Sequence, residues 1–445
     1  MRQLLVEKVL FPLWELKHSG TRLSQLKALR ESQWWPAERL ANYQERRLKT
    51  LYARAVQTVP YYSSLVREGR LPAQITGLDA LPSLPLLSKS DVRRLGDRLL
   101  SSDIKQSQLK SAKTGGSTGT SLTLYFDKQC EEWRNAAEAR SGEWAGKAIG
   151  EPFFALWGNM GKPETLGEWF RDRVLNGVIY VDTMAINDGI VEGFVEAWRR
   201  SPARSIYGHA HSIYIIAARL KRMGVRDIRP RSIISTSMTL LDAERRIIEE
   251  VFHCKATNRY GCEEVGLIAA ECEAHSGLHV NAEHVIVEVL RADGSAALDG
   301  EEGDVVVTDL NNFGMPLIRY RIEDRSSWIA ERCKCGRSSA RLRSIAGRVA
   351  DFLKKADGTL VAGVSLVERT LTAFPEIEQL QIVQSVMDRF EMRVVPGLGY
   401  TEDVARNLVG EMTKIFGAEI EVAVVTRTAL ERTGREKFRF AICRV

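Results

Sequence analysis

Long hydrophobic runs are missing from the 445 residues of this chain. A membrane-spanning helix needs about 18 consecutive apolar residues, whereas the longest uncharged stretch, 205–218, is shorter and contains His209 and His211. The first residues also lack the apolar core of a secretory signal, because Glu7 and Lys8 interrupt them. The sequence therefore predicts a cytoplasmic protein without a membrane span.

A strong excess of one charge sign is also missing. The 63 Lys and Arg residues outnumber the 57 Asp and Glu residues by only six. Over this length the excess is too weak to predict a nucleic-acid partner. Cysteine is sparse as well, and the seven cysteines form an odd number without the density of a disulfide scaffold. They are expected to be thiols or metal ligands.

What remains is an ordinary globular composition, with 44% hydrophobic and 27% charged residues. The length predicts more than one domain. Residues 1–70 are expected to be helical, because apolar residues recur at helical spacing before Pro60. From about 110 to 310, strand-like and helix-like runs alternate, which predicts α/β layers. The expected strands are 122–127, 152–158, 231–237, 284–290 and 303–310, and the expected helices are 131–146 and 241–252.

The last 95 or so residues have a pattern of their own. Strands are expected at 379–384, 391–396 and 419–425, with an amphipathic helix that starts after Thr401. We therefore expect a large N-terminal domain of layered sheets and helices over 1–346 and a small α+β domain over 347–445.

Glycine and hydroxyl residues are concentrated in one stretch, KTGGSTGTSLTLYFD (113–127), directly before an expected strand. Glycines allow close approach of an anion, and successive N–H and hydroxyl groups can hold phosphate oxygens. No Gly-Lys-Ser/Thr follows, so the stretch is not a Walker A loop. On its own it could equally be a flexible surface turn.

Three further stretches carry polar side chains suited to a nucleotide. In NRYGCEEVG (258–266), Tyr260 could stack on a purine and a glutamate could bind Mg²⁺. In MPLIRYRIEDRS (315–326), Asp324 could accept hydrogen bonds from ribose hydroxyls. Lys437, near the C-terminus, could neutralise developing negative charge. Taken singly, the alternatives are a solvated acidic turn, a surface ion pair and an exposed lysine.

Together, in this order, the stretches resemble the ANL superfamily of adenylate-forming enzymes. The chain is most similar to the phenylacetate–CoA ligase family and its CapK-like branch, which is found with capsular polysaccharide genes. GGSTGTSL matches the phosphate loop, YGCEE the Tyr-Gly-x-x-Glu motif, IRYRIED the Arg-Tyr-Arg-x-Gly-Asp motif and GRVAD the Gly-Arg-x-x-Asp motif. TGREKFR stands where the family has its C-terminal catalytic lysine.

The resemblance implies an enzyme that activates a small carboxylic acid with ATP and Mg²⁺ through an acyl-AMP and then transfers the acyl group to CoA. Lys437 and Glu264 are the implied catalytic residues, with Glu264 also binding Mg²⁺. The implied nucleotide-binding residues are Thr114, Gly115, Gly116, Ser117, Thr118, Gly119, Thr120, Ser235, Thr236, Ser237, Tyr260, Gly261, Asp324 and Arg348. Tyr207 and His209 could line the same pocket, or be structural.

Several positions depart from the family pattern. Glu323 replaces the glycine before Asp324, Ala350 stands at the hinge position, and Glu436 replaces the glycine before Lys437. The last two bear on rotation of the small domain and therefore on thioester formation. Two alternatives stay open: a CapK-like enzyme that passes an acyl or nucleotidyl group to a non-CoA acceptor in polysaccharide biosynthesis, or a nucleotide-binding scaffold with reduced catalysis. A monomer or a dimer is expected.

A second group of residues has the chemistry of a zinc site. Cys272, His279, Cys333 and Cys335 offer three thiolates and an imidazole, the ligands of structural zinc, with His275 as an alternative ligand. Some relatives of the phenylacetate–CoA ligase type resemble this pattern and bind a structural zinc. Simple buried thiols are the alternative.

Overall fold

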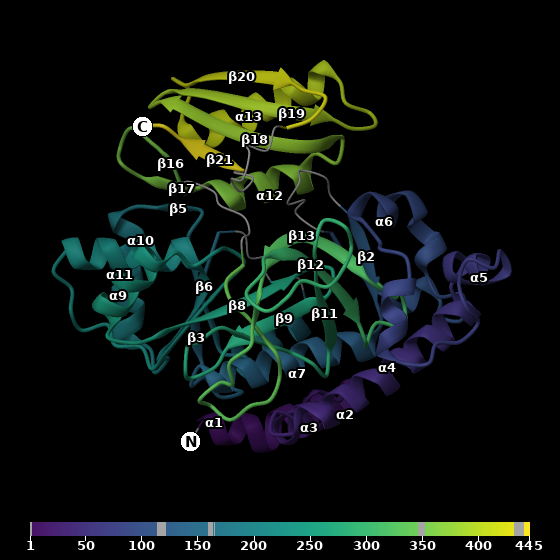
Figure 1. Cartoon of the computed structure of the whole chain (residues 1–445). Helices are drawn as coiled ribbons and strands as arrows, with labels where there is room; N and C mark the ends of the chain where they lie inside the picture. The colour runs from purple at the N-terminus through teal and green to yellow at the C-terminus, as the bar shows by residue number, and fades with distance from the viewer. Residues whose placement is uncertain (1, 114–121, 159–162, 164, 346–351, 431–439) are drawn as a thin grey trace. The chain divides into compact units, whose positions relative to one another are not determined.

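The computed structural model describes residues 2–113, 122–158, 163, 165–345, 352–430 and 440–445 (Figure 1). Helices and strands alternate through the central part of the chain, which confirms the predicted α/β class. None of the described helices is long and apolar enough to cross a bilayer. The chain divides into two compact units: Met1–Ala112 with Thr123–Gly150 and Thr257–Ala346, and Lys113–Leu122 with Glu151–Ala256 and Gly347–Val445.

The first unit begins with the predicted helices. Leu48, Leu51 and Ala55 lie on the buried face of α4. This helix ends at Thr58, and Pro60 starts the next one, since the first helical position needs no amide donor. The N-terminal elements are α1 (Arg2–Leu5), the π-helical η1 (Val6–Leu10), α2 (Phe11–His18), α3 (Arg22–Ser32), α4 (Ala37–Thr58) and α5 (Pro60–Arg67).

Short elements then lead to the central helix of this unit. They are η2 (Leu78–Ser83), α6 (Lys89–Leu95), η3 (Gly96–Leu99), η4 (Gln106–Gln108), β1 (Lys110–Lys113), β2 (Thr123–Phe126) and α7 (Lys128–Trp144). The Asp127 carboxylate caps α7 by accepting from the Cys130 amide at 2.8 Å. Its other oxygen accepts from the amides of Phe313 and Gly314 and so fixes the start of the helix.

Antiparallel strands form the rest of the first unit. One group runs in the order β14-β15-β10-β9-β8 and the other in the order β11-β12-β13. Their bounds are β8 (Ala256–Cys262), β9 (Gly266–Glu271), β10 (Leu278–Val280), β11 (Val285–Leu290), β12 (Gly303–Asp309), β13 (Tyr320–Ser326), β14 (Trp328–Ile329) and β15 (Arg341–Leu342). β11 and β12 are the predicted antiparallel pair, and α7 contacts β9 (Figure 1).

The second unit contains a parallel group of strands in the order β7-β6-β3-β4. β3, β6 and β7 are mostly buried, as expected for parallel strands covered by helices, whereas the edge strand β4 is only partly buried. The helices α9, α10 and α11 gather beside β3 and β6 (Figure 1). The elements are β3 (Phe153–Trp157), α8 (Leu166–Trp169), the π-helical η5 (Phe170–Leu175), β4 (Val178–Asp182), β5 (Ala185–Ile186), α9 (Asp188–Arg200), β6 (Ser205–His209), α10 (Ala210–Arg222), β7 (Ser232–Thr236) and α11 (Asp242–Phe252).

The C-terminal segment of the second unit has a core that includes Leu380, Phe390, Leu408 and Met412. Its strand order is β20-β19-β18-β21, and the predicted strands and helix are present. The elements are β16 (Phe352–Lys354), β17 (Leu360–Ala362), α12 (Gly363–Ala373), β18 (Ile377–Val386), β19 (Arg389–Pro396), α13 (Glu402–Phe416), β20 (Glu421–Thr426) and β21 (Ala441–Cys443). The domain boundary predicted after residue 346 lies outside the described residues and stays a prediction.

Candidate functional site

The predicted catalytic and nucleotide-binding residues fall into two groups. Those of the glycine-rich loop, Thr114 to Thr120, lie outside the described residues, as do Arg348 and Lys437. In the chain the loop stands between β1 and β2. The described group consists of Ser235, Thr236, Ser237, Tyr260, Gly261, Glu264 and Asp324.

The hairpin of β8 and β9 carries Tyr260, Gly261 and Glu264. Cys262 pairs with Gly266, so residues 263–265 form its turn. A side chain at position 261 could not be accommodated, because its Cβ would lie 2.6 Å from the Gly266 carbonyl oxygen. Tyr260 and Glu264 are both buried, which is unusual for a carboxylate in a hairpin turn. The Tyr-Gly sequence thus shapes the turn that buries Glu264.

Two tyrosine–carboxylate pairs join this hairpin to β13. The Tyr260 hydroxyl donates to Asp324 Oδ2 at 2.9 Å, and the Tyr320 hydroxyl donates to Glu264 Oε1 at 3.2 Å. The hairpin and β13 each carry a tyrosine and, four positions later, an acidic residue. Each tyrosine donates to the acidic residue of the other segment. Burial, followed by the Glu264 charge, raises the pKa of Tyr320, so its hydroxyl stays protonated as a donor. The structure therefore brings Tyr260, Glu264 and Asp324 together.

Asp324 stands at an irregularity in β13. Asp304 of β12 pairs with Arg325, whereas Val306, two positions later, pairs with Arg321. The residues between form a bulge, a feature that redirects side chains beside functional sites. Within it, Glu323 has a φ of 72°, in the left-handed region that favours glycine. Glu323 stands where the motif that this stretch resembles has glycine, and its left-handed backbone is one that glycine adopts without strain.

Replacing Glu323 by glycine is expected to stabilise the protein. A non-glycine residue in the left-handed region costs roughly 1–2 kcal/mol, part of which the greater freedom of an unfolded glycine offsets. We expect a gain of about 1 kcal/mol in the free energy of unfolding, measured by urea denaturation. Glu302→Gly, at a position without a positive φ, serves as the control and should bring no gain. If Glu323→Gly has a lower free energy of unfolding than the unchanged protein, the backbone at Glu323 is not strained.

The carboxyl ends of the parallel strands gather polar and aromatic side chains in the second unit. Ser235 and Thr236 end β7, and Ser237 follows with a φ of 65°, another strained non-glycine residue. Trp157, at the end of β3, stacks on Tyr207 with ring centroids 5.7 Å apart. Ligands of α/β sheets bind at such strand ends.

His209 completes this aromatic group. Its ring centroid lies 4.0 Å from that of Trp157. Burial, with a smaller effect of His211, lowers the pKa of His209 to about 4, so the imidazole is neutral near pH 7. A neutral ring offers packing and hydrogen bonding rather than a positive charge for an anion.

The predicted zinc ligands of the first unit also lie together. The ligand atoms of Cys272, His279, Cys333 and Cys335 lie within 4.8 Å of one another. Cys272 Sγ is 3.7 Å from Cys333 Sγ, and His279 Nε2 is 3.4 Å from Cys335 Sγ. His275 does not join them: its φ is 46° and its Nδ1 lies 3.2 Å from a Glu271 carboxylate oxygen. The donor set of three sulfurs and one nitrogen fits tetrahedral zinc.

Surrounding groups prepare two of these ligands, His279 and Cys333, for a cation. Because the Ser339 carbonyl can only accept, His279 Nδ1 donates to it at 3.2 Å and Nε2 keeps its lone pair. Burial lowers the pKa of His279 to about 4, which keeps the ring neutral. Burial alone would disfavour the Cys333 thiolate, but hydrogen bonds, first from Ser276, bring its pKa down to about 7. A neutral imidazole and an accessible thiolate are what zinc requires.

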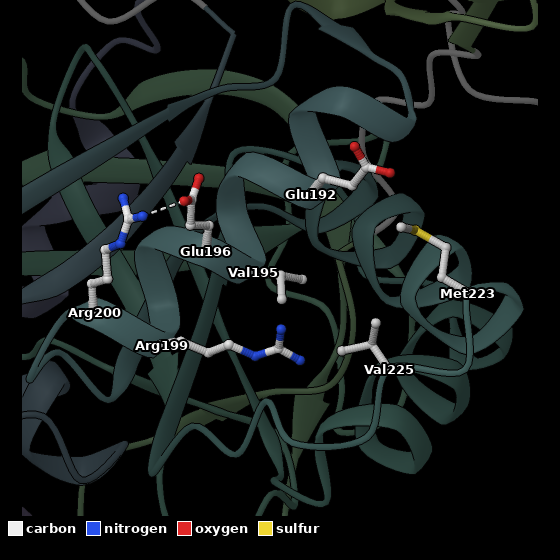
Figure 2. Close-up of a pocket in the computed structure, with 7 residues that line it drawn as sticks. All are labelled: Glu192, Val195, Glu196, Arg199, Arg200, Met223 and Val225. Atoms are coloured by element: carbon white, nitrogen blue, oxygen red, sulfur yellow. Dashed lines mark hydrogen bonds and ion pairs between the residues drawn. The ribbon is translucent and has the colours of Figure 1, made fainter.

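A surface cavity of about 440 Å³ lies between α9 and the end of α10 (Figure 2). Val195, Met223 and Val225 supply apolar walls, and an ion pair joins Glu196 to Arg200 across one turn of α9. Arg199 is engaged by Asp227 at 2.7 Å. The remaining lining residue is Glu192. None of these residues belongs to the predicted nucleotide or zinc site.

The comparisons with known proteins agree with these motifs, although no family model matches the sequence. The phenylacetate-coenzyme A ligase of Thermus thermophilus is 26% identical over 407 residues, covering 84% of this chain and 86% of the relative. That of Aromatoleum evansii is 24% identical over 89% of this chain and 92% of its own. This chain is a homologue of phenylacetate–coenzyme A ligases. The resemblance predicted from the motifs is thereby confirmed.

Solved structures of a CoA ligase share the fold of this chain. The 2-hydroxyisobutyryl-CoA ligase bound to 2-HIB-AMP and CoA has a TM-score of 0.62 at 19% identity, covering 93% of each chain. The open conformation of the same enzyme gives a TM-score of 0.59 over 92% of each chain. The predicted fold, that of an adenylate-forming enzyme with layered sheets and helices, is confirmed. Tyr320 and Trp157 had no predicted role, although Tyr320 lies inside the IRYRIED stretch.

Proposed function

We propose that this protein activates a carboxylic acid with ATP, forms an acyl-AMP and transfers the acyl group to CoA, as an acid–thiol ligase that releases AMP. The single observation that carries the proposal is the pair of crossed tyrosine–carboxylate hydrogen bonds. It brings together two motifs, 56 to 64 residues apart, that resemble motifs of adenylate-forming enzymes. The homology to phenylacetate–coenzyme A ligases supports the same reaction.

The chemistry explains why a nucleotide is needed. A carboxylate oxygen is a poor leaving group, whereas AMP is a good one. In the first step the substrate carboxylate attacks the α-phosphorus of ATP and pyrophosphate departs. In the second step the CoA thiolate attacks the acyl carbon, the bond to the phosphate oxygen breaks and AMP leaves. Negative charge grows on the departing phosphates in the first step, so cationic groups there lower the barrier.

Each named residue has one role in this proposal. Tyr260 stacks on adenine, and Asp324 accepts hydrogen bonds from the ribose hydroxyls. Glu264 offers a carboxylate oxygen, the ligand type that Mg²⁺ prefers, and the ion would neutralise phosphate charge. The loop from Thr114 to Thr120 holds pyrophosphate. Lys437 neutralises charge between the carboxylate and the α-phosphate, and Arg348 lies near the nucleotide.

The acid is proposed to bind at the strand ends that carry Trp157, Tyr207 and His209. Flat rings that stack and tilt on one another offer a surface for another flat group. The loop 235–239, which follows β7, would contribute Ser235, Thr236 and Ser237 to the nucleotide and acyl pocket. An aromatic carboxylic acid is therefore the preferred substrate class.

The cysteine and histidine cluster is proposed to hold a structural zinc ion. Its ligands come from the segment between β9 and β10, from β10 itself and from the turn before β15. A closed site of four protein ligands leaves no position for a substrate, so its role would be to fix these segments. The residues after 346 are proposed to form the small mobile domain that carries Lys437.

A second candidate, transfer to a non-CoA acceptor, is favoured by two sequence positions. Ala350 replaces the residues common at the hinge, and Glu436 replaces the glycine before the catalytic lysine. Both changes affect the second half-reaction more than the first. In this case an acyl-AMP forms as before, and a different nucleophile receives the acyl group.

Exchange of labelled pyrophosphate into ATP tests the proposal directly. A panel of aromatic and aliphatic acids should reveal exchange that depends on both the acid and Mg²⁺. Release of AMP that depends on CoA would then separate the thiol ligase from the second candidate. Absence of acid-dependent exchange across the panel, in a protein that binds ATP, would refute both enzymatic proposals and leave a nucleotide-binding scaffold.

Replacing Tyr260 by phenylalanine is expected to weaken ATP binding while leaving the ring in place. The loss of a hydrogen bond to a carboxylate costs roughly 1.5 kcal/mol, so we expect the Kd for ATP to rise by about tenfold. Isothermal titration calorimetry measures this directly. Tyr52→Phe is the control, because its hydroxyl donates to the Pro72 carbonyl and touches no site residue. An unchanged Kd in Tyr260→Phe would contradict the role of the pair.

A further inference from the structure

One arginine holds the turn that carries Glu264. Arg134, on α7, donates from Nη1 to the Glu263 carbonyl at 3.1 Å and from Nη2 to the Glu264 carbonyl at 2.8 Å. Its Nη2 also pairs with the buried carboxylate of Asp309 at 3.2 Å. A guanidinium that binds two successive carbonyls fixes the orientation of the peptide between them. Arg134 therefore sets the backbone from which the Glu264 side chain projects.

His284 holds the third carbonyl of the same turn. Its Nε2 donates to the Val265 carbonyl at 2.8 Å, and its Nδ1 accepts from Asn311 Nδ2 at 3.1 Å. This arrangement requires the neutral ring, and burial lowers the pKa of His284 accordingly. All three carbonyls of 263–265 are thus held by side chains from outside the hairpin.

The residues around Arg134 leave room for its contact with the hairpin turn. Gly266, with a φ of 73°, lies under the Arg134 side chain, and a Cβ there would be 2.9 Å from Arg134 Cγ. The guanidinium carbon also lies 4.7 Å from the centre of the Phe126 ring. Phe126 ends β2, the strand that follows the glycine-rich segment 114–121 in the chain. Arg134 therefore links the strand after the proposed phosphate loop to the turn with the proposed Mg²⁺ ligand.

We propose that Arg134 and His284 are positioning residues that hold the Glu264 carboxylate in place for the Mg²⁺ ion of bound ATP. The inference rests on the proposed function and extends it to residues that touch neither nucleotide nor metal. Outer residues that orient a metal ligand commonly change metal affinity by about 10- to 100-fold when removed. Loss of either residue should therefore weaken the binding of the metal ion more than the binding of the nucleotide itself.

The test uses Arg134→Met and His284→Leu in the full-length protein. Mn²⁺ serves as the probe, and its binding in the presence of ATP is followed by electron paramagnetic resonance. We expect the Kd for Mn²⁺ to rise by about tenfold or more in each variant. The Kd for ATP measured without divalent ions should stay close to the unchanged value. His284→Gln, whose side-chain amide can replace the Nε2 donor, should restore most of the Mn²⁺ affinity.

Arg140→Met is the matched control. Arg140 is also a buried arginine of α7, and it pairs with Glu283 at 2.7 Å and Asn281 at 2.6 Å. Loss of Arg140 should reduce the melting temperature at least as much as loss of Arg134. Among the hydrogen bonds described, however, Arg140 makes none to the turn 263–265. Arg140→Met should therefore keep normal Mn²⁺ affinity. If Arg134→Met fails to fold, Arg134→Lys, which cannot bind both carbonyls in the same plane, replaces it.

The outcomes separate this inference from the proposed function. If the unchanged protein exchanges pyrophosphate and binds Mn²⁺ with ATP, but Arg134→Met and His284→Leu bind Mn²⁺ normally, the positioning role is overturned and the proposed function stands. If Arg140→Met loses as much Mn²⁺ affinity as Arg134→Met, the effect is one of general stability and the inference is again overturned. If the unchanged protein binds ATP but shows no acid-dependent exchange, the proposed function itself fails.

Discussion

Replacing Lys437 by alanine is expected to reduce the rate of acyl-adenylate formation on the order of 100- to 1,000-fold, the usual effect of removing one group that stabilises developing charge. The lysine is proposed to act on the transition state, so the Kd for ATP should change little. Pyrophosphate exchange measures the rate, and equilibrium titration with ATP measures the binding.

Lys414→Ala supplies the control for this prediction. Lys414 lies on α13 in the same C-terminal segment, is 72% exposed and pairs with Glu411. Removing it deletes the same charge from the chain without touching a predicted site residue, and exchange should continue at the normal rate. Exchange at the normal rate in Lys437→Ala as well would mean that the C-terminal lysine is not part of the reaction.

Removal of zinc is expected to have the second large effect, on stability rather than on rate. Elemental analysis should find about one zinc ion per chain, because four ligands complete one tetrahedral site. Cys333→Ser should lose the metal. A ligand held a thousandfold above its Kd stabilises a protein by roughly 4 kcal/mol, so the melting temperature should fall clearly. Treatment with a strong chelator should lower the melting temperature of the unchanged protein to that of Cys333→Ser.

Cys254→Ser tests whether the loss of any cysteine lowers the zinc content and the melting temperature. Cys254 is half-buried and lies outside the cluster. Its replacement should leave both the zinc content and the melting temperature almost unchanged. A metal-free preparation with full stability would mean that the four side chains are an ordinary thiol cluster.

The sequence motifs named residues that the structure brings together, but not how these residues are arranged. The order of the motifs selected Tyr260, Glu264 and Asp324, which the structure joins through crossed hydrogen bonds. The crossing itself was not predictable, because it depends on how two distant strands are registered in space. Glu323 was visible as a departure from the glycine of the resembled motif, but only the structure shows that its φ is positive.

Local spacing also has limits. His275 and His279 both follow Cys272 within one short stretch, at positions +3 and +7, and spacing alone could not choose between them. The structure separates them because His279 lies on β10 beside the cysteines, whereas His275 occupies a turn against Glu271. Arg134 could not be recognised from the sequence, since an arginine among the charged residues of a helix is usually a surface residue. Tertiary contacts alone reveal that it holds the turn.

The crossed tyrosine–carboxylate pairs have a consequence for sequence change in the family. A chimaera that takes the β8–β9 hairpin from one relative and β13 from another inherits two halves of a shared set of contacts. A changed tyrosine in one segment removes a hydrogen bond from the carboxylate of the other segment. A harmful change in one segment can therefore be offset only by a change in the other. The two segments should therefore diversify together, and transplanting both at once should preserve activity that a single transplant destroys.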